Sequence, residues 1–593
     1  MIPGYHSRVA VEQPRESRPQ PTVVATERAL WLIIMVLVAY RLAYHASYLG
    51  EVPFAHATFS DGAVYEQSAR DILEHPPLGR EPFYLQGAYA YLLALGMTVR
   101  AWPSFGLLVQ LLLAFATLAL FHRSVVRLWG RTPGLVSSIA LLAYPGLAFY
   151  ENKYLSAELG IACNVLVLAS FVALLGRERS RWPLALALGA ASGLAILARP
   201  NMVIALPFSL LAIAALADGD DWRARARAAA GPCAALLLGT VLALAPMAAR
   251  NLAVTGHPDV QPIHGGGTSF FIGNNPEARG VWNNAGLLSA NLGTESAELT
   301  VALGIDPQLD DRDRARAIGA ALYARSFAWI RENPGDWLAL ELKKLWLTIG
   351  DQQLTQDYDW RGERELLPWA HRVGVSFSML LALGLLGAGA TLGGRSANAM
   401  PDGRANTPRA KRALAWFGLG QLLAPLAANL LFFTSAQHRL PLIVPLALFA
   451  GPGTLALITL VRSRFAARPV PSMLLLAAAL ALLQGPWPRS RQSHPHPIHY
   501  YNLAMVQDSI GEPLAALASL DRAIELRPEQ PIFHMRRAHL RLRLNDLRGA
   551  EQDLAVIAAV AAREPVPPWV LEQAQLDAWA IQHHSSQAES QPE

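Results

Sequence analysis

The chain has 593 residues, of which 52% are apolar and only 16% are charged, whereas soluble domains carry roughly 25% charged residues. The formal charge of +5 does not indicate nucleic-acid binding, because the basic residues gather in five short segments between apolar stretches. Composition and charge therefore exclude an ordinary soluble protein and a nucleic-acid-binding protein. They predict an integral membrane protein.

The amino-terminal segment, residues 1–28, is rich in Pro, Arg and Glu and is expected to be disordered. Most of the apolar stretches that follow approach the ~20 helical residues that cross a bilayer core of ~30 Å. The sequence therefore predicts an all-α polytopic membrane protein with about 11 transmembrane helices. The stretches cover residues 29–49, 104–121, 133–150, 157–175, 183–198, 202–217, 232–249, 373–392, 413–433, 440–460 and 471–483.

The five basic segments all fall on the amino-terminal side of the membrane if the chain crosses 11 times. The positive-inside rule makes that side cytoplasmic. The outer side then carries a first loop at 50–103, a long hydrophilic segment at 251–372 and the carboxyl-terminal tail. A further apolar stretch at 83–99 is short, and we expect it to form a helix in the outer interface. If it crosses instead, the chain has 12 spans and the tail is cytoplasmic.

The predicted spans form two blocks, at 29–250 and 373–486, on either side of the long hydrophilic segment. Within that segment, residues 310–350 have the apolar spacing of helices. We expect the stripe formed by this spacing to be buried. It comprises Leu322, Phe327, Ile330, Leu338 and Leu345.

The tail repeats with a period of 34 residues, which is typical of tetratricopeptide (TPR) units built from two short helices. Ala504, Ala516 and Leu520 are matched 34 residues later by Ala538, Ala550 and Leu554. We expect TPR-like repeats at 498–562 and a flexible tail at 563–593. Two units are fewer than the three or more that normally stabilise such an array, so they should pack on the long segment or on a partner protein. A plain helical hairpin is the alternative.

Ionisable residues are nearly absent from the interiors of the predicted spans and gather at their outer ends. Transporters and pumps instead place such groups in mid-span, so the pattern argues against a transporter. A ring of ionisable groups at one interface suits chemistry on a substrate whose tail lies in lipid and whose head lies in water. The ring comprises Glu158, Arg199, Arg250, His438 and Arg439.

Asp61 follows the first predicted span in the run Phe59–Tyr65. A carboxylate at this place can activate an acceptor as a base, or hold a metal on a leaving phosphate. The alternative is an ordinary helix-capping aspartate, because Asp is favoured at the N-cap position. Tyr65, one turn later, stacks on a sugar in the first interpretation and packs in the core in the second.

Motifs in the outer loops follow one another in the order known from one enzyme family. They are Asp61 with Tyr65 and Ala69, Pro82-Phe83-Tyr84, Tyr144-Pro145, Ser156-Ala157-Glu158, Arg199-Pro200, 271–276 and Arg439-Leu440-Pro441. This order resembles the C-type (GT-C fold) glycosyltransferases, in the branch of the protein O-mannosyltransferases and the aminoarabinose transferase of lipid A. The chain departs from the family at Ala88 and Ala90, where prolines commonly flank the tyrosine after the first loop.

The resemblance implies an enzyme with a GT-C-like bundle that uses a polyprenyl-phosphate sugar. It implies Asp61 and Glu158 as catalytic carboxylates, and Glu81 and His264 as candidate ligands of a divalent metal ion. The implied substrate-binding residues are Tyr65, Tyr84, Arg199, Arg439, Asn274 and Asn275, with Arg41 as a further phosphate contact. The alternative for each arginine is an interfacial anchor, and for Glu158 it is a residue favoured by the helix dipole.

We therefore expect a hexosyl- or pentosyltransferase at the outer face of the inner (plasma) membrane. It transfers a sugar from polyprenyl phosphate to a lipid, polysaccharide or protein acceptor, with inversion in a single displacement. One alternative is an O-antigen ligase or polymerase, and another is a non-catalytic membrane scaffold whose TPR-like tail recruits a protein partner. No nucleic-acid partner is expected.

Overall fold

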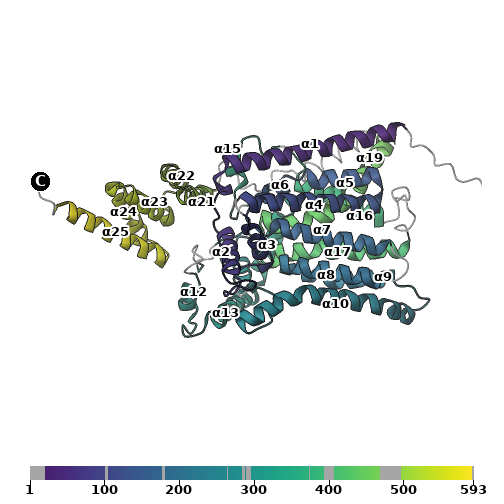
Figure 1. Cartoon of the computed structure of the whole chain (residues 1–593), viewed down its shortest axis with the longest axis horizontal. Coiled ribbons are helices and arrows are strands. Elements are labelled where there is room, and N and C mark those ends of the chain that lie inside the picture. The colour runs from purple at the N-terminus through teal and green to yellow at the C-terminus, as the bar shows by residue number, and fades with distance from the viewer. Residues whose placement is uncertain are drawn as a thin grey trace, which may run out of the picture.

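The structure of the chain is a computed structural model. It describes residues 21–99, 104–176, 181–262, 265–283, 287–288, 295–354, 356–372, 374–392, 407–467 and 496–589. Within these ranges it contains helices and no strand. A bundle of long, roughly parallel helices carries smaller helices at one end (Figure 1). The predicted fold class, an all-α polytopic membrane protein, is confirmed.

Each predicted apolar stretch up to residue 460 coincides with a helix or a pair of helices. The helices are α1 (Pro21–Glu51), α4 (Ser104–Trp129), α5 (Arg131–Leu142), α6 (Pro145–Glu151), α7 (Ala157–Leu175), α8 (Trp182–Ala198), η2 (Pro200–Ile204), α9 (Ala205–Leu216), α10 (Trp222–Thr255), α16 (Phe377–Leu392), α17 (Pro408–Leu431), η3 (Leu440–Leu442) and α19 (Ile443–Ala467). In the described part, six helices are individually long and apolar enough to span a membrane, and the pair α5–α6, bent by 56°, gives a seventh. The stretch at 471–483 lies outside the described residues.

The outer helices of the bundle expose apolar faces, as a surface covered by lipid requires. Leu32 and Met35 on α1 are 66% and 62% exposed, and Val241 on α10 is 61% exposed. Inside the bundle, glycines allow close packing: a Cβ on Gly189 of α8 would collide with the Leu236 carbonyl of α10. The helices therefore pack closely on one another inside the bundle, and their outward faces are apolar.

The first loop stays at one end of the bundle. Trp31 near the start of α1 contacts His122 near the end of α4, with ring centroids 5.1 Å apart, so the two helices run in opposite directions. The segment between them contains η1 (Pro53–Ala55), α2 (Asp61–Glu74) and the 11-residue α3 (Gly87–Met97). The stretch at 83–99 thus begins and ends at the same end of the bundle and does not cross it (Figure 1).

The long hydrophilic segment adds helices at that same end. They are α11 (Gly265–Gly273), α12 (Glu295–Leu303), α13 (Asp311–Glu332), α14 (Pro334–Ile349) and α15 (Trp360–Leu366). The predicted buried stripe was wrong in part, because Leu322 is fully buried whereas Phe327 and Leu338 are each 56% exposed. Leu338, Leu342 and Leu345 lie on one exposed face of α14. An apolar face on a helix beside a membrane bundle is suited to lipid contact, which hydrophobic spacing alone cannot distinguish from core packing.

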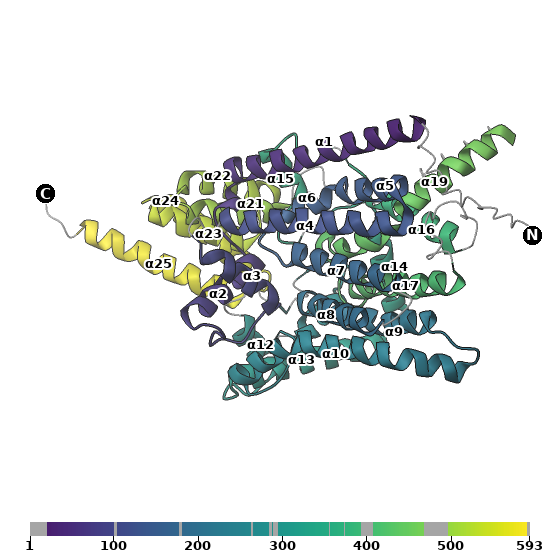
Figure 2. The same cartoon turned by 45° about the vertical axis from the view of Figure 1, so that its right-hand side comes forward.

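The carboxyl-terminal tail lies at the end of the bundle where α1 ends, beside α15 (Figure 2). It consists of α21 (Pro497–Ser509), α22 (Pro513–Leu526), α23 (Pro531–Arg543), α24 (Leu547–Ala561) and α25 (Pro568–Glu589). The helices α23 and α24 begin 34 residues after α21 and α22, respectively. The region 563–593 was expected to be flexible, but α25 occupies most of it.

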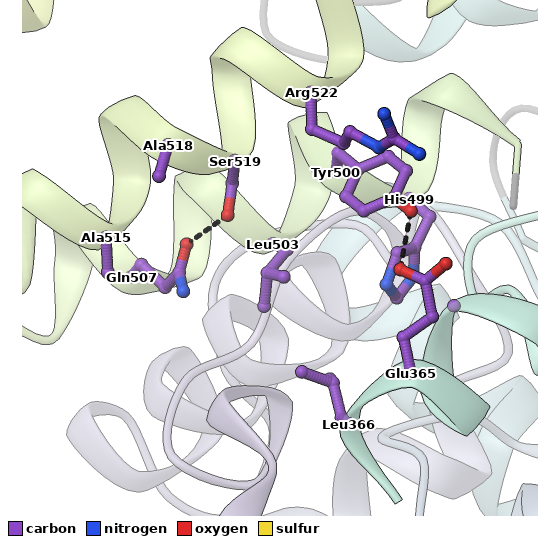
Figure 3. A pocket seen from close by; sticks show the side chains of 11 residues that line it. Glu365, Leu366, His499, Tyr500, Leu503, Gln507, Ala515, Ala518, Ser519 and Arg522 are labelled. Carbon is purple, nitrogen blue, oxygen red and sulfur yellow. Dashed lines mark hydrogen bonds between the residues drawn. The ribbon is translucent and has the colours of Figure 1, made fainter. Parts of the chain in front are cut away.

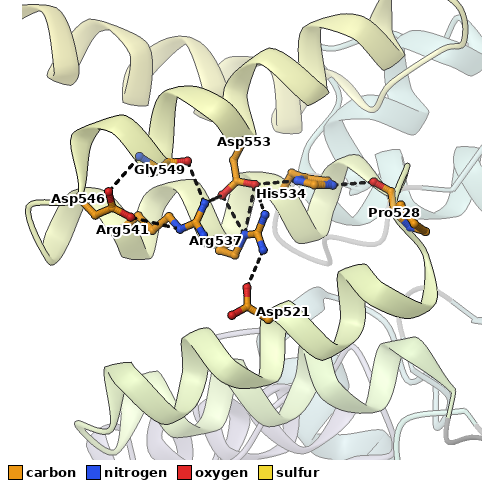
Figure 4. A network of polar contacts seen from close by, with 8 residues as sticks. All are labelled: Asp521, Pro528, His534, Arg537, Arg541, Asp546, Gly549 and Asp553. Atoms are coloured by element: carbon orange, nitrogen blue, oxygen red, sulfur yellow. Dashed lines mark hydrogen bonds and ion pairs between the residues drawn. The ribbon is translucent and has the colours of Figure 1, made fainter.

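A buried carboxylate joins the second helical pair of the tail (Figure 4). Asp553 on α24 is 1% exposed and accepts hydrogen bonds from Arg537 Nη2 at 2.6 Å and Arg541 Nη1 at 2.9 Å. Its Oδ1 also lies 2.7 Å from His534 Nδ1. These contacts fix α23 on α24, so the tail is a packed unit.

The arrangement predicts the sidedness of two fusion sites. The first loop and the tail share one end of the bundle, whereas the α9–α10 loop lies at the other end with Arg223, Arg225 and Arg227. Alkaline phosphatase, which is active only in the periplasm, should therefore be active when fused after Pro528 and inactive when fused after Gly219. Cell-based phosphatase assays with matched expression measure this difference. The opposite pattern would place the tail in the cytoplasm.

Candidate active site

Asp61 stands at the amino terminus of α2, but it does not cap that helix. The N-cap residue is Ser60, and α2 has no side-chain cap hydrogen bond. Ser60 has a positive φ of 48°, and its hydroxyl donates to Asp357 Oδ1 at 2.6 Å. Positive φ is strained for a residue other than glycine, and such strain clusters at functional sites. The capping interpretation of Asp61 therefore finds no support in the hydrogen bonds of α2.

The carboxylate beside Asp61 is Asp357, which precedes α15 and was missed in the sequence. Removal from water raises the pKa of Asp61 well above its ordinary value, and the charge of Asp357 raises it further, against the opposing effect of Arg199. Removal from water raises the pKa of Asp357 as well, against the hydrogen bond from Ser60. Two neighbouring carboxylates hold a proton more tightly than either alone. The pair therefore combines a basic carboxylate with a nearby negative charge.

Arg199 brings an uncommitted guanidinium to the same place. It follows α8, is 8% exposed, and interacts electrostatically with Asp61, Tyr65 and Tyr150. Its Nε and Nη2 atoms are buried and have no hydrogen-bond partner among the described residues. Gly160 of α7 makes room for it, because a Cβ there would lie 3.0 Å from Arg199 Cγ. Buried donors without acceptors are costly, so this group is suited to an anionic ligand.

The two predicted tyrosines differ in their surroundings. Tyr65 is 3% exposed, donates to Gln86 Oε1 at 2.5 Å, and packs edge-on against Tyr89 with centroids 4.7 Å apart. Tyr84 is half-buried, and its hydroxyl lies 3.4 Å from Glu295 Oε1. Removal from water raises the pKa of Glu295 to about 7, against its hydrogen bond with Tyr84. Tyr65 is thus a wall of the site, and Tyr84 joins the long segment to its rim.

Glu158, the predicted second carboxylate, lies in a different cluster. It is 1% exposed and interacts electrostatically with Glu151 and Arg41. Arg41 forms an ion pair with Glu151 and also donates to the Leu142 carbonyl at 3.2 Å. The structure therefore groups Glu158 with Arg41 and Glu151, and it groups Asp61 with Asp357 and Arg199.

Arg439 is committed to the main chain. It is fully buried, donates to the carbonyls of Gly350 and of Gln352, the latter at 2.9 Å, and lies 4.6 Å from the centre of the Phe377 ring. Its guanidinium therefore fixes the chain that leads toward Asp357.

The predicted asparagines are likewise engaged with the protein. The amide of Asn274 donates to the Leu431 carbonyl at 2.7 Å, and that of Asn275 donates to the Phe271 carbonyl at 2.7 Å. Both side chains are at most 2% exposed. Asn274 thus joins the end of α11 to the end of α17, whereas Asn275 bonds back to α11 itself, and both amide groups have protein partners.

The candidate metal ligands are not brought together among the described residues. Glu81 is exposed, and its main-chain carbonyl, rather than its carboxylate, accepts from Arg250 Nη2 at 2.6 Å. His264 lies outside the described residues. Within the part of the chain that the structure describes, no three His, Cys, Asp or Glu side chains form a group that could hold a metal ion.

A second buried network, also missed in the sequence, supports the segment of Asp357. Lys153, between α6 and α7, is fully buried and places its Nζ 2.5 Å from Glu363 Oε2 of α15. His371 Nε2 lies 2.7 Å from the other carboxylate oxygen. Burial alone would raise the pKa of Glu363, but Lys153 and His371 lower it to about 2. The network therefore anchors α15 to the bundle just after Asp357.

Comparisons with known proteins give only distant similarities. No protein-family model matches this chain, and no curated protein matches it. The chain is similar to the solved structure of the oligosaccharyltransferase AglB from Archaeoglobus fulgidus, in complex with an inhibitory peptide and a dolichol-phosphate. The identity is 12%, the TM-score is 0.37, and the match covers 82% of this chain but only 55% of the archaeal chain.

A second similar structure is ArnT from Cupriavidus metallidurans bound to undecaprenyl phosphate. Here the identity is 14% and the TM-score is 0.33, with 94% of this chain and 79% of that chain covered. Similarities of this size establish neither family nor activity.

The buried network predicts a large effect of removing one charge. Lys153→Met should leave Glu363 buried without its lysine and lower the free energy of unfolding by about 3–5 kcal/mol. Thermal unfolding in detergent measures this loss, with exposed Lys343→Met as the control. Adding Glu363→Gln to Lys153→Met should restore part of the stability. Equal unfolding temperatures for Lys153→Met and wild type would contradict the anchoring role.

Proposed function

We propose that this protein is a membrane glycosyltransferase that takes its sugar from a polyprenyl-phosphate donor at the outer face of the inner membrane. The observation that carries the proposal is the buried guanidinium of Arg199, which has two donor atoms without partners and lies near the Asp61–Asp357 pair. A planar guanidinium binds phosphate oxygens through two parallel hydrogen bonds. The arrangement therefore offers a phosphate contact and a base at the end of a lipid-embedded bundle.

The reaction proceeds as a single displacement. Arg199 holds the phosphate of the donor while an acceptor hydroxyl or amine on a lipid, polysaccharide or protein approaches the anomeric carbon. The bond from the acceptor to that carbon forms as the bond from the carbon to the phosphate oxygen breaks, and configuration inverts. Asp61 takes the acceptor proton, and polyprenyl phosphate leaves with the electron pair of the broken bond.

Asp357 makes Asp61 a better base in this scheme. Its negative charge stabilises the protonated form of Asp61, which is the form produced by the transfer step. The positive charge of Arg199 nearby keeps the site from carrying two uncompensated negative charges. The positions of Asp61, Asp357 and Arg199 on three separate segments favour a role for all three.

The Asp61–Asp357 pair also fits a divalent cation in its chemistry, because Mg²⁺ is often held by one or two carboxylates together with substrate phosphates. One oxygen of Asp357, Oδ2, is buried without a partner among the described residues. Such a cation would polarise the leaving phosphate. We assign the proton to Asp61 itself, because Arg199 already supplies a positive charge beside the pair.

Removal of metal ions tests this assignment. Transfer by detergent-solubilised protein, measured with a polyprenyl phospho-sugar and an acceptor, should persist after treatment with EDTA. A loss of transfer that Mg²⁺ or Mn²⁺ restores would show that the carboxylate pair acts through a metal.

The carboxylates are predicted to differ in their effects. Asp61→Asn should reduce transfer by ~10²-fold or more, because it removes the base, while membrane abundance stays normal. Full transfer by Asp61→Asn would remove Asp61 from the mechanism.

Asp357→Asn should instead lower the pKa of Asp61, because it removes a neighbouring negative charge while Arg199, Tyr65, Tyr84 and Tyr358 remain. The acid limb of the pH–rate profile should therefore move to lower pH. An unchanged acid limb in Asp357→Asn would show that Asp357 does not raise the pKa of Asp61.

Arg199 is predicted to act on donor use. Arg199→Lys keeps the charge but loses the two-pronged geometry, so kcat/KM for the donor should fall by ~10-fold or more. Arg70→Lys is the matched control, because this exposed arginine is already paired with Glu66 at 2.5 Å. Wild-type donor kinetics in Arg199→Lys would show that Arg199 is only an interfacial anchor.

A further inference from the structure

The first helix of the tail and the residue before it bind the short stretch that carries Asp357 at two points. Asn502 Nδ2 of α21 donates to the main-chain carbonyl of Asp357 at 3.0 Å. The main-chain amide of His496, just before α21, donates to Asp359 Oδ2 at 2.9 Å. The other oxygen of Asp359 caps α15 by accepting from the amide of Arg361 at 2.6 Å. One helix therefore binds the carbonyl of Asp357 and the cap of the helix that follows it.

The packing around these hydrogen bonds is tight. Leu503 and Val506 of α21 belong to the same continuous hydrophobic core as the membrane helices. A Cβ on Gly362 of α15 would collide with the ring of His499, and that ring lies 5.6 Å from the ring of Phe54 in η1. The helix α21 is thus seated between the first loop and α15.

Direct contact with α15 comes from α21, whereas a pocket of about 290 Å³ lies between α15 and the next helix, α22 (Figure 3). At the edge of the pocket, the Tyr500 hydroxyl donates to Glu365 Oε2 at 2.5 Å. Leu503 faces Leu366 across it. The helix α21 therefore supplies the hydrogen bond of Tyr500 and the close contact of the His499 ring that seat α15 on the tail.

The chain on the other side of Asp357 is fixed independently by Arg439, through the carbonyls of Gly350 and Gln352. Asp357 thus lies between the contacts that Arg439 of the membrane bundle makes and the contacts that α21 of the tail makes. Displacement of a reacting group by ~1 Å can cost ~10²-fold in rate. The contacts of α21 are therefore placed where they set the distance between Asp357 and Asp61.

From these contacts we infer that α21 is a built-in part of the active site, and that Asn502 is a positioning residue that acts through Asp357. This inference rests on the proposed transferase function. It assigns to the tail a role in the catalytic step itself, with the rest of the tail free to serve as a surface for other contacts.

The test uses the full-length protein in detergent or vesicles with a polyprenyl phospho-sugar. Asn502→Ala and the isosteric Asn502→Asp both remove the donor to the Asp357 carbonyl, and kcat should fall about tenfold while the donor KM stays unchanged. Gln573→Ala is the matched control, because its amide donates within the tail to Asp577 Oδ1 at 2.9 Å. That variant should keep wild-type kcat.

A double-mutant cycle distinguishes positioning from general destabilisation. In an Asp357→Asn background, Asn502→Ala should have no further effect on kcat, because the group it positions is already lost. Full additivity, wild-type kcat in both Asn502 variants, or a change confined to donor KM would each overturn the inference.

Thermal unfolding identifies any variant that fails to fold. Should both Asn502 variants do so, Tyr500→Phe, which loses only the hydroxyl at Glu365, takes their place with the same expected fall in kcat. Wild-type kcat in Tyr500→Phe would then overturn the inference. Absence of transfer by the wild-type protein under conditions that keep it folded would refute the proposed function itself.

Discussion

The buried ion pair between Lys153 and Glu363 is the interaction on which the outer end of the molecule depends. Lys153 stands in the turn between α6 and α7, and its Nζ also lies 3.9 Å from the centre of the Tyr48 ring. A buried ammonium is tolerated only with a partner of opposite charge and good geometry. Glu363 and the aromatic ring supply both, so α15 has one position on the bundle, and Asp357 precedes it.

The site assembles charges that the apolar bundle excludes elsewhere. Asp61 comes from the first loop, Arg199 from the end of α8, and Asp357 from the segment between α14 and α15. Each is placed by residues without a chemical role of their own: Ser60, Gly160 and Arg439. Positioning residues and reacting residues have different requirements. A buried charge must have neighbours that satisfy its hydrogen bonds, whereas a reacting group must keep a donor or acceptor atom free for the substrate.

The sequence predicted the membrane helices well, because about 20 apolar residues in a row have few other uses. It also singled out Arg199 by its place at a span end and Asp61 by its place in the first outer loop as candidate site residues. Asp357 and Lys153 were missed because the role of each depends on a partner over 200 residues away in the sequence. For Lys153 that partner is Glu363. Arg439 and Asn274 show the converse, since both match a motif yet donate to carbonyls of their own chain. Hydrophobic spacing likewise could not show that Leu338 faces outward.

The seating of α21 links the site to the order in which the chain is made. Asn502 follows Asp357 by 145 residues, so every helix of the bundle up to α19 precedes it in synthesis from the amino terminus. A ribosome that stalls after α19 leaves a chain with Asp61 and Arg199 already inserted but with the carbonyl of Asp357 unheld. On the role inferred for α21, Asp357 is therefore held in place only after α21 has been made and has reached the same end of the bundle.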